Sequence, residues 1–358
     1  MLARDLRTLW ATLREQGWRM AGNYAVFRWL FSVHWRPVAW ALNRLRPYPV
    51  MLEVEVTTAC NLRCTMCERT YWDEPARHLS YEAFIRILDQ FPGLRWIDIT
   101  GIGEGLCHPR YLDMVREIKR RGIFLELYDP FVLWTPAVTD RMLDCGLNRI
   151  QPSVDAATKE TYEKIRVGAT WDVMLNNLRY LFREKERRGV RLPVVHFHYI
   201  VQRDNIHEMP AFVALVRSLA GRQRVGVQFT EILHAFPEIR ALQTSITPER
   251  VAEVEEMGRA KGVEVWWNRN VATRPKADMR RCSLWLMPFI FGDGTVVPCC
   301  GLNESNARNR QWATGLGNIK EQPFWEIWEG ERYQRMRREL RQGRVPAPCR
   351  GCPVFEAQ

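Results

Sequence analysis

Three cysteines in the pattern C-x3-C-x2-C, Cys60, Cys64 and Cys67, carry the clearest chemical signal of this chain. They follow the alternating segment 52–56, a pattern typical of a β-strand. Thiolate is the ligand that iron-sulfur clusters require, and a short loop lets three thiolates converge on one centre. Three cysteine ligands leave one iron of a four-iron cluster without a protein ligand. An open coordination position of this kind is typical of catalytic rather than structural metal sites. A zinc site or three reduced structural thiols are the alternatives, although zinc sites usually pair C-x2-C elements.

This spacing resembles the motif of the radical S-adenosylmethionine superfamily, which lies on the loop after the first strand of a partial (β/α) barrel. The resemblance implies that the open iron chelates the methionine moiety of S-adenosylmethionine. It also implies reductive cleavage to a 5′-deoxyadenosyl radical that abstracts a substrate hydrogen, with an external one-electron reductant such as flavodoxin or ferredoxin. One detail departs from the family pattern, because the residue before the last cysteine, often aromatic there, is Met66.

A glycine-rich segment with one carboxylate follows the second expected strand. Glycine lets a backbone approach a ligand closely, and a carboxylate pairs with an ammonium group. The segment resembles the family's Gly-Gly-Glu motif, which implies that Gly101, Gly103 and Glu104 bind the amino group of S-adenosylmethionine. By the same resemblance, Ser153 and Arg166 hold its carboxylate and ribose region. An ordinary solvated helix charge is the alternative for Arg166.

The fifth expected strand carries two further groups of candidates. Ile200, Val201 and Asn205 resemble the family's adenine platform, and plain core packing is an equal alternative for the two apolar residues. His196 and His198 are two residues apart and therefore share a face of the strand. Inside a barrel they could contact substrate or act as acid and base, and a buried structural role is an equal alternative.

Substrate recognition is harder to assign, because the turn after the third strand departs from the family pattern. Members often carry Thr-Asn-Gly or a similar turn there, and this chain has Tyr128 and Asp129 followed by proline. These two residues, with Gln228 and Glu231 at the end of the sixth strand, are therefore candidates for contact with substrate.

A second set of four cysteines falls in the C-terminal region, namely Cys282, Cys299, Cys349 and Cys352. With the surrounding Gly-Asp-Gly and Gly-Asn-Ile segments, the set resembles the SPASM auxiliary domain, which implies one auxiliary [4Fe-4S] cluster with four protein ligands. A structural zinc is the alternative. The spacing from Gly294 favours Cys299, with Cys300 as the alternative ligand. Cys107 and Cys145 are expected to be buried small hydrophobes.

The elements that must position these residues alternate along the chain. Strand patterns occur at 51–57, 95–100, 123–128, 148–154, 193–202 and 224–230, with helical patterns between them. This alternation predicts an α/β fold, a partial (β/α)6 TIM-like barrel with its chemistry at the carboxyl ends of the strands. A loop-rich cysteine cluster domain and an N-terminal helical extension complete it. We therefore divide the chain into an extension (1–50), a barrel (51–235), a connecting β/α segment (236–274) and an auxiliary domain (275–358).

The extension supplies over half of the net charge of +11, because its eight arginines outnumber Asp5 and Glu15 by six. It also contains five tryptophans and reads as basic amphipathic helices. We expect its apolar face to pack on the barrel, with peripheral contact to a membrane or an acidic partner as the alternative. No apolar run approaches the roughly 20 residues of a membrane span. A cytoplasmic protein without a nucleic-acid partner is expected.

The closed second cluster leads to a hypothesis about the reaction. A fully ligated cluster cannot bind substrate through iron but can accept the electron that a substrate radical loses. The chain is therefore predicted to be an oxidoreductase acting on a small-molecule, sugar or lipid-linked substrate. A peptide maturase that forms a crosslink or epimerises a residue is the alternative. A non-catalytic electron carrier or zinc-stabilised binding protein is the rival outside enzymes.

Overall fold

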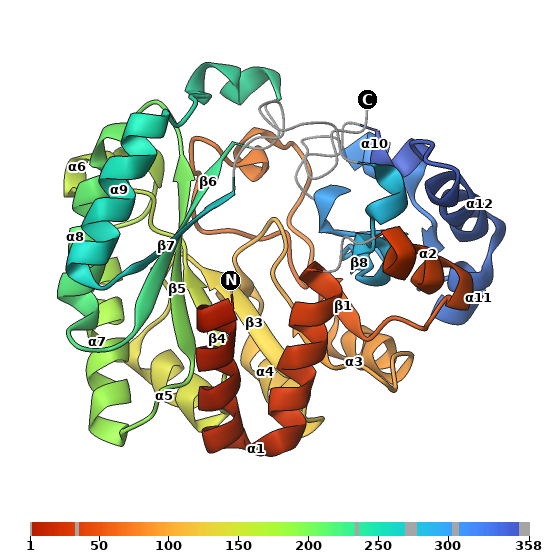
Figure 1. Cartoon of the computed structure of the whole chain (residues 1–358), viewed down its shortest axis with the longest axis horizontal. Coiled ribbons are helices and arrows are strands. Elements are labelled where there is room, and N and C mark those ends of the chain that lie inside the picture. The colour runs from red at the N-terminus through yellow and green to blue at the C-terminus, as the bar shows by residue number, and fades with distance from the viewer. Residues whose placement is uncertain (1, 33–35, 233–235, 269–277, 303–307, 351–358) are drawn as a thin grey trace.

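The computed structural model describes residues 2–32, 36–232, 236–268, 278–302 and 308–350. A run of seven neighbouring parallel strands forms the centre of its sheet (Figure 1). They are β1 (Met51–Val54), β2 (Trp96–Asp98), β3 (Phe124–Asp129), β4 (Arg149–Pro152), β5 (Val194–Val201), β6 (Val225–Glu231) and β7 (Glu264–Asn268). The first six coincide with the six predicted strands. The seventh comes from the segment predicted as a connection, and it extends the sheet beyond β6.

Helices connect successive strands, as expected for a parallel sheet. They are α3 (Tyr81–Asp89), α4 (Tyr111–Arg120), α5 (Pro136–Asp144), α6 (Lys159–Ile165), α7 (Trp171–Arg188), α8 (Met209–Ala220) and α9 (Pro248–Lys261). Local sequence explains where they begin. Ser80 caps α3 by accepting a hydrogen bond from the Ala83 amide, and α3 buries Phe84 and Ile87 on one face. Thr135 caps α5, and Pro136 occupies its first turn.

The sheet forms an open, partial barrel among the described residues. On the edge that faces away from β2, β1 pairs in parallel with β8 (Phe289–Ile290). The sheet then continues through β9 (Thr295–Val297) to β10 (Gly317–Asn318). The auxiliary region thus shares one sheet with the barrel. The predicted fold class, a partial TIM-like α/β barrel with a helical N-terminus, is confirmed.

The N-terminal extension packs against the barrel. Figure 1 shows α1 (Leu2–Ser32) folding back on itself, and the turn is at Gly17, which has a φ of 81°. Met20, Tyr24 and Phe27 are buried, and the Phe27 ring stacks on Trp96 at 4.6 Å. The predicted packing of the extension is therefore confirmed, but Leu6 and Leu13 of its expected apolar face are about half exposed.

A buried ion pair joins β3 and β4 and contacts α1. Arg149 of β4 donates to Glu126 of β3 at 3.1 Å, and its other terminal nitrogen donates to the Tyr24 hydroxyl at 3.2 Å. Glu126 also accepts from Gln151. Arg149, Glu126 and Gln151 are hydrogen-bonded to one another and fill this part of the interior, although Arg149 Nε and Gln151 Oε1 have no hydrogen-bond partner among the described residues.

The C-terminal region joins short strands to three helices, α10 (Arg308–Thr314), α11 (Phe324–Glu329) and α12 (Glu331–Arg341). The second N-terminal helix, α2 (Arg36–Leu45), packs against α12, and both lie on the right in Figure 1. Trp285, Trp328 and Tyr333 form the aromatic core of this region. Among the described helices, none is long and apolar enough to cross a membrane.

Candidate functional site

A cavity of about 450 Å³ lies at the carboxyl ends of the central strands. Most of the side chains selected from the sequence line it. The predicted residues in its wall are Cys60, Cys64, Cys67, Gly101, Gly103, Glu104, Tyr128, Asp129, Ser153, Arg166, His198, Ile200, Gln228 and Glu231. The structure therefore brings together residues from the ends of β1 to β6, which are far apart in sequence.

The cysteine loop is held by hydrogen bonds that leave its thiols facing the cavity. The Leu62 amide donates to the Cys60 sulfur at 3.4 Å, and Arg166 Nη1 lies 3.8 Å from the Cys64 sulfur. Hydrogen bonds to sulfur are a normal feature of iron-sulfur sites, where they help to set the potential. Met66 is buried and lines the same cavity, so it can shield a cluster as an aromatic residue would.

These thiols fit an iron-sulfur cluster by their chemistry. Burial raises the pKa of Cys60 to about 11 and that of Cys67 to about 12. At neutral pH they hold their protons until a metal displaces them, because metal ligation requires the thiolate. Three thiols in one cavity wall match a cluster with three protein ligands, and the remaining wall offers oxygen and nitrogen groups for a further ligand.

Gly101 and Gly103 let the second loop pack against the cysteine loop. A Cβ at Gly103 would lie 2.5 Å from the carbonyl oxygens of Thr57 and Ala59, and one at Gly101 would overlap the side chain of Glu55. The Glu104 amide donates to the Ala59 carbonyl at 2.8 Å. The glycines therefore bring the two loops into close contact, a reason for glycine that adds to the expected approach of a ligand.

Two buried carboxylates, Glu104 and Asp129, lie together in the cavity wall. Both side chains are almost fully buried, and burial raises the pKa of each carboxyl, with their mutual repulsion raising that of Asp129 further. Each also accepts a backbone amide, Glu104 from Leu106 at 3.2 Å and Asp129 from Phe131 at 2.6 Å. An ammonium group between them would relieve the repulsion, which fits the amino group of S-adenosylmethionine.

Arg166 is fixed by Asp155, a residue that sequence analysis did not select. Their ion pair is buried, and Asp155 also accepts the Ile200 amide at 2.7 Å. Asp155 has a φ of 66°, a left-handed conformation that non-glycine residues rarely adopt. Arg166 Nε has no hydrogen-bond partner among the described residues. Ser153 lines the cavity next to this pair, and its amide donates to the Asp129 carbonyl.

The three residues expected at the adenine platform have different environments. Ile200 lines the cavity, whereas Val201 is fully buried outside its wall. Asn205 is also fully buried, and its amide donates to the carbonyls of Asp155 and Ile200 and accepts the Gln202 amide. Asn205 therefore ties together the loops after β4 and β5, and Ile200 is the residue of the three in position to contact a ligand.

The two histidines of β5 lie in different cavities. His198 lines the cavity that contains the three cysteines (the cysteine cavity). Its Nε2 atom lies 3.0 Å from Thr230 Oγ1, and its ring packs edge-on against Tyr128. Burial lowers its pKa to about 4, so it is neutral at physiological pH. His196 instead lines a separate cavity with residues of α1 and packs on Trp266. Of the two alternatives given for these histidines, His198 is therefore in position to contact a substrate, whereas His196 is buried outside the cysteine cavity, as in a structural role.

Asp98 is a cavity residue that sequence analysis missed. It lies at the end of β2, accepts the Thr100 amide at 2.7 Å and lines the cavity with Glu53. Burial raises its pKa to about 8, so it holds a proton at neutral pH. The alternation Trp96, Asp98, Thr100 was the available signal, because it places a carboxylate on one face of a buried strand.

The described auxiliary cysteines lie on short segments next to α10 and α12. Cys282 follows a turn (Met279–Arg281) that packs against α2 and α12, and Cys349 ends a turn (Ala347–Cys349) that packs against α10. Cys300 lines the cysteine cavity, whereas Cys299 is close enough to Tyr333 of α12 to raise its pKa. The predicted ligand Cys352 lies outside the described residues. Cys107 and Cys145 are partly exposed, which differs from their expected burial.

A buried ion pair joins the auxiliary region to the cysteine loop. Arg308 of α10 donates to both oxygens of Glu55, at 2.7 and 2.8 Å, and its guanidinium lies over the rings of Trp72 and Phe291. Glu55 also accepts backbone amides from both sides, from Ile102 in the barrel and from Gly292 in the auxiliary region. Glu55 precedes the cysteine loop by a few residues, so the two regions are locked together beside the first cluster site.

Comparison with known proteins identifies both parts of this arrangement. The model of the Radical SAM superfamily matches residues 54–216, which contain Cys60, Cys64 and Cys67. The model of the SPASM iron-sulfur cluster-binding domain matches residues 282–353, which contain the four predicted ligands Cys282, Cys299, Cys349 and Cys352 together with Cys300. The two matches meet in the structure at the Glu55–Arg308 ion pair.

Similar proteins cover much of the chain. A tungsten-containing aldehyde ferredoxin oxidoreductase cofactor-modifying protein of Pyrococcus furiosus is 27% identical over 86% of this chain and 88% of its own. A PqqA peptide cyclase of Methylorubrum populi is 29% identical over 52% of this chain and 47% of its own. SuiB of Streptococcus suis, solved with S-adenosylmethionine, shares the fold, with a TM-score of 0.64 and 12% identity over 81% of this chain and 68% of its own. The chain therefore belongs to the radical S-adenosylmethionine superfamily of enzymes and carries a C-terminal SPASM iron-sulfur domain.

Proposed function

We propose that this enzyme oxidises a polar small molecule by two electrons. The first cluster, when bound, supplies the electron that cleaves S-adenosylmethionine and so starts radical chemistry. The observation that carries the proposal is the single cavity in which three thiols, the Glu104–Asp129 pair and a further set of polar side chains face one another. The reaction type rests on the expectation that four cysteines ligate the auxiliary cluster, which would then have no open position for substrate.

The residues of this chain have separate tasks in that cavity. Cys60, Cys64 and Cys67 hold the cluster, while Glu104 and Asp129 hold the ammonium group of S-adenosylmethionine. Arg166, held in place by its ion pair with Asp155, directs a positive charge toward the cluster loop and the carboxylate of the ligand. Burial of these groups excludes water, which protects reactive species from side reactions.

The remaining wall supports a polar small-molecule substrate. Tyr128, His198 and Gln228 line it, and all three side chains can donate and accept hydrogen bonds. Neutral His198 and protonated Asp98 can exchange protons with a substrate hydroxyl or amine. The relative matched over nearly its whole length is named for cofactor modification, which agrees with a small substrate. A lipid-linked or sugar substrate belongs to the same proposal.

A peptide substrate is the second candidate. It is favoured by the match to PqqA peptide cyclase, which covers about half of each chain. The N-terminal region offers less support, because residues 2–32 and 36–45 are helical and contain no strand to which a peptide could add. Product analysis separates the two candidates. A crosslink lowers the mass of the peptide and an epimerised residue is detected by chiral amino-acid analysis, whereas oxidation of a small molecule leaves every peptide unchanged.

The first test is cleavage of S-adenosylmethionine by the anaerobically reconstituted protein. We expect 5′-deoxyadenosine from the wild type and a loss of at least a hundredfold when Cys60, Cys64 or Cys67 is replaced by alanine. Cys145→Ala is the matched control, because this partly exposed thiol lies outside the cavity wall. Cleavage that survives the triple alanine variant would disprove the proposal, as would a wild type that binds iron but not S-adenosylmethionine.

The second test concerns the auxiliary cluster. The wild type should hold about eight irons per chain, as two four-iron clusters require. Cys299→Ala should lose about four irons and stop substrate oxidation while leaving uncoupled cleavage of S-adenosylmethionine in place. Cys300→Ala should keep all of its iron, because this side chain lines the cavity of the first cluster. Zinc in place of four of the irons would contradict the electron-accepting role.

A further inference from the structure

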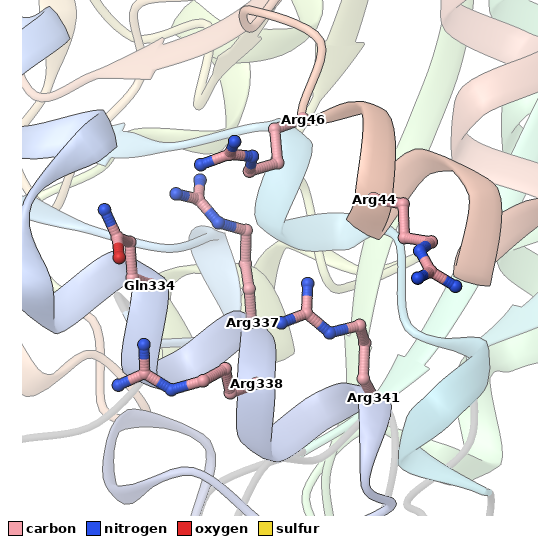
Figure 2. Close-up of a pocket in the computed structure, with 6 residues that line it drawn as sticks. All are labelled: Arg44, Arg46, Gln334, Arg337, Arg338 and Arg341. Atoms are coloured by element: carbon pink, nitrogen blue, oxygen red, sulfur yellow. The ribbon is translucent and has the colours of Figure 1, made fainter.

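Five arginines line a third cavity, the arginine cavity, which lies between α2 and α12 in the C-terminal region and is distinct from the two cavities described above. Its volume is about 480 Å³, and its wall consists of Arg44, Arg46, Gln334, Arg337, Arg338 and Arg341. Figure 2 shows Arg44 and Arg46 entering from the end of α2 and the other four from α12. The cavity shares no lining residue with the cysteine cavity, so it is a separate site.

Arg337 is the buried member of this group, and part of its guanidinium is unsatisfied. Its exposed fraction is 1%, and one terminal nitrogen donates to the Trp328 carbonyl at 2.7 Å. The Nε and Nη1 atoms have no hydrogen-bond partner among the described residues. A buried charged donor without an acceptor is costly, and native proteins rarely keep one without a partner. The guanidinium also lies over the rings of Trp328 and Tyr333, at 4.9 and 5.4 Å, so the aromatic core supplies part of its stabilisation. Its two remaining N–H groups can still bond to an acceptor that the chain does not supply.

The charges around the cavity are only partly balanced. Within the described residues, the two ion pairs of these arginines both involve Glu329, which lies 2.8 Å from Arg46 and 4.0 Å from Arg337. Glu329 is itself about half exposed, so solvent weakens its effect. Burial lowers the pKa of Arg337 to about 10, and its neighbours Arg46 and Arg341 act in the same direction. All five groups still carry positive charge at neutral pH.

The backbone of Arg46 is held in an unusual conformation at the same place. Its φ is 46°, and its amide donates to the Leu42 carbonyl at 2.8 Å, so it ends α2 in the left-handed region. Glycine or asparagine usually occupies this position, because a larger side chain is disfavoured there. An arginine at this point places its guanidinium over the cavity, where it faces the buried Arg337 (Figure 2).

We propose that this cavity binds a phosphate or pyrophosphate group. Arginine forks match phosphate oxygens in pairs, and several forks around one space suit a group with more than one negative charge. The phosphate could belong to a soluble molecule or to a lipid headgroup. Trp40 and Leu45 of α2 are exposed beside the cavity, and Arg44 lies 4.6 Å above the Trp40 ring, which would place apolar side chains next to a headgroup. The site does not depend on the proposed reaction.

The test uses the reconstituted full-length protein and inorganic pyrophosphate, with calorimetry as the readout. We expect the affinity to fall about tenfold in Arg338→Gln and further in a double variant with Arg341→Gln, because each loses a charge-assisted hydrogen bond. Arg335→Gln is the matched control, since this arginine lies on the same helix but outside the cavity. Arg337 is left intact because its removal could disturb the aromatic core.

A second arm identifies the source of the phosphate group. Wild type and variants are sedimented with phosphatidylcholine vesicles that contain or lack phosphatidylglycerol. Sedimentation that needs the anionic lipid and is lost in the double variant assigns the site to a headgroup. Pyrophosphate binding without such sedimentation assigns it to a soluble phosphate. If neither probe responds to the Arg338 and Arg341 substitutions, or if Arg335→Gln has the same effect, the proposal is wrong.

Discussion

The cavity lined by Cys60, Cys64 and Cys67 (the cysteine cavity) and the cavity between α2 and α12 (the arginine cavity) contain side chains of opposite charge, and these side chains differ in how deeply they are buried. In the first, buried carboxylates such as Glu104, Asp129 and Asp98 face one another, and burial raises the pKa of each. In the second, arginines surround an open space, and only Arg337 is deeply buried. The carboxylates can reduce their repulsion by taking up protons. Arginines cannot do so at neutral pH, so their site stays charged and depends on an anion or solvent.

The Glu55–Arg308 pair is a contrasting case, in which the chain supplies the partner of each buried charge. Both groups are buried, every oxygen of Glu55 is bonded, and the guanidinium lies between two aromatic rings. Neither group lines a cavity as an unsatisfied donor or acceptor does. The Arg308 guanidinium differs from that of Arg337 in its acceptor: Arg308 bonds to both oxygens of a buried carboxylate, whereas Arg337 bonds to one backbone carbonyl and lines a cavity.

The strongest test of this distinction is removal of Arg308. Arg308→Met should destabilise the protein by about 3–5 kcal/mol, because Glu55 is left as an uncompensated buried charge. Adding Glu55→Gln should recover part of that loss, since the buried charge is then removed. Anaerobic thermal unfolding measures both changes. By contrast, Arg335→Gln breaks an exposed ion pair with Glu331 and should cost at most about 1 kcal/mol.

Equal stability of the Arg308 and Arg335 variants would show that the Glu55–Arg308 pair does not join the two regions. The same experiment reports on function, because Glu55 precedes the cysteine loop. Loss of iron from the first cluster in Arg308→Met, without change in Arg335→Gln, would indicate that the auxiliary region helps to position that loop.

A smaller effect is expected at Glu104 and Asp129, the carboxyl pair in the wall of the cysteine cavity. Glu104→Gln should weaken S-adenosylmethionine binding about ten- to a hundredfold, because a charge-assisted bond to the ammonium group contributes about 1.5–3 kcal/mol. Asp129→Asn should act in the same direction. Calorimetry on the reconstituted protein measures the dissociation constant. Glu160→Gln, at an exposed position of α6, is the control and should leave that constant unchanged.

An unaltered affinity in both Glu104→Gln and Asp129→Asn would place the ammonium group elsewhere. The stability of these variants provides an independent check. Each variant replaces one carboxyl of this hydrogen-bonded pair by an amide of similar shape, which can keep the bond, so the stability of the ligand-free protein should change little. Weaker binding could then not be attributed to unfolding.

Much of the fold was predictable because local signals and family spacing agree. The six strands of the barrel, the cap at Ser80 and the convergence of the cysteines with Glu104 and Ser153 in one cavity all follow from periodicity and motif. Parallel strands place their carboxyl ends at one edge, so residues that end different strands must meet there. No detailed knowledge of packing was needed for these predictions.

Other features depend on long-range packing that sequence patterns do not contain. The separation of His196 from His198 depends on where α1 packs against β5. The joining of β1 to β8 and the pairing of Glu55 with Arg308 link segments more than 200 residues apart. The arginine cavity arises only because α2 and α12 meet, and their arginines look like ordinary solvated charges in the sequence.

The last expected effect is a pH dependence caused by Asp98, whose pKa burial raises to about 8. An acid with a raised pKa holds its proton more tightly in the folded protein than in the unfolded chain. Its contribution to stability is therefore present below the unfolded value of about 4 and is lost as the pH rises to about 8. Asp98→Asn cannot ionise and avoids that loss. Its melting temperature relative to wild type should rise between pH 5 and pH 8, then level off.

A rise of about 4 °C would correspond to about 3 kcal/mol in a protein of 358 residues. His198 has the opposite dependence, because burial lowers its pKa to about 4, but it is present in both proteins and cancels in the difference. Asp113→Asn is the control, since a hydrogen bond from Arg110 keeps the pKa of that exposed carboxyl below its usual value, outside this pH range. A constant difference for Asp98→Asn would mean that Asp98 is ionised at neutral pH. It would then be a paired charge like Glu55 rather than a protonated acid facing substrate.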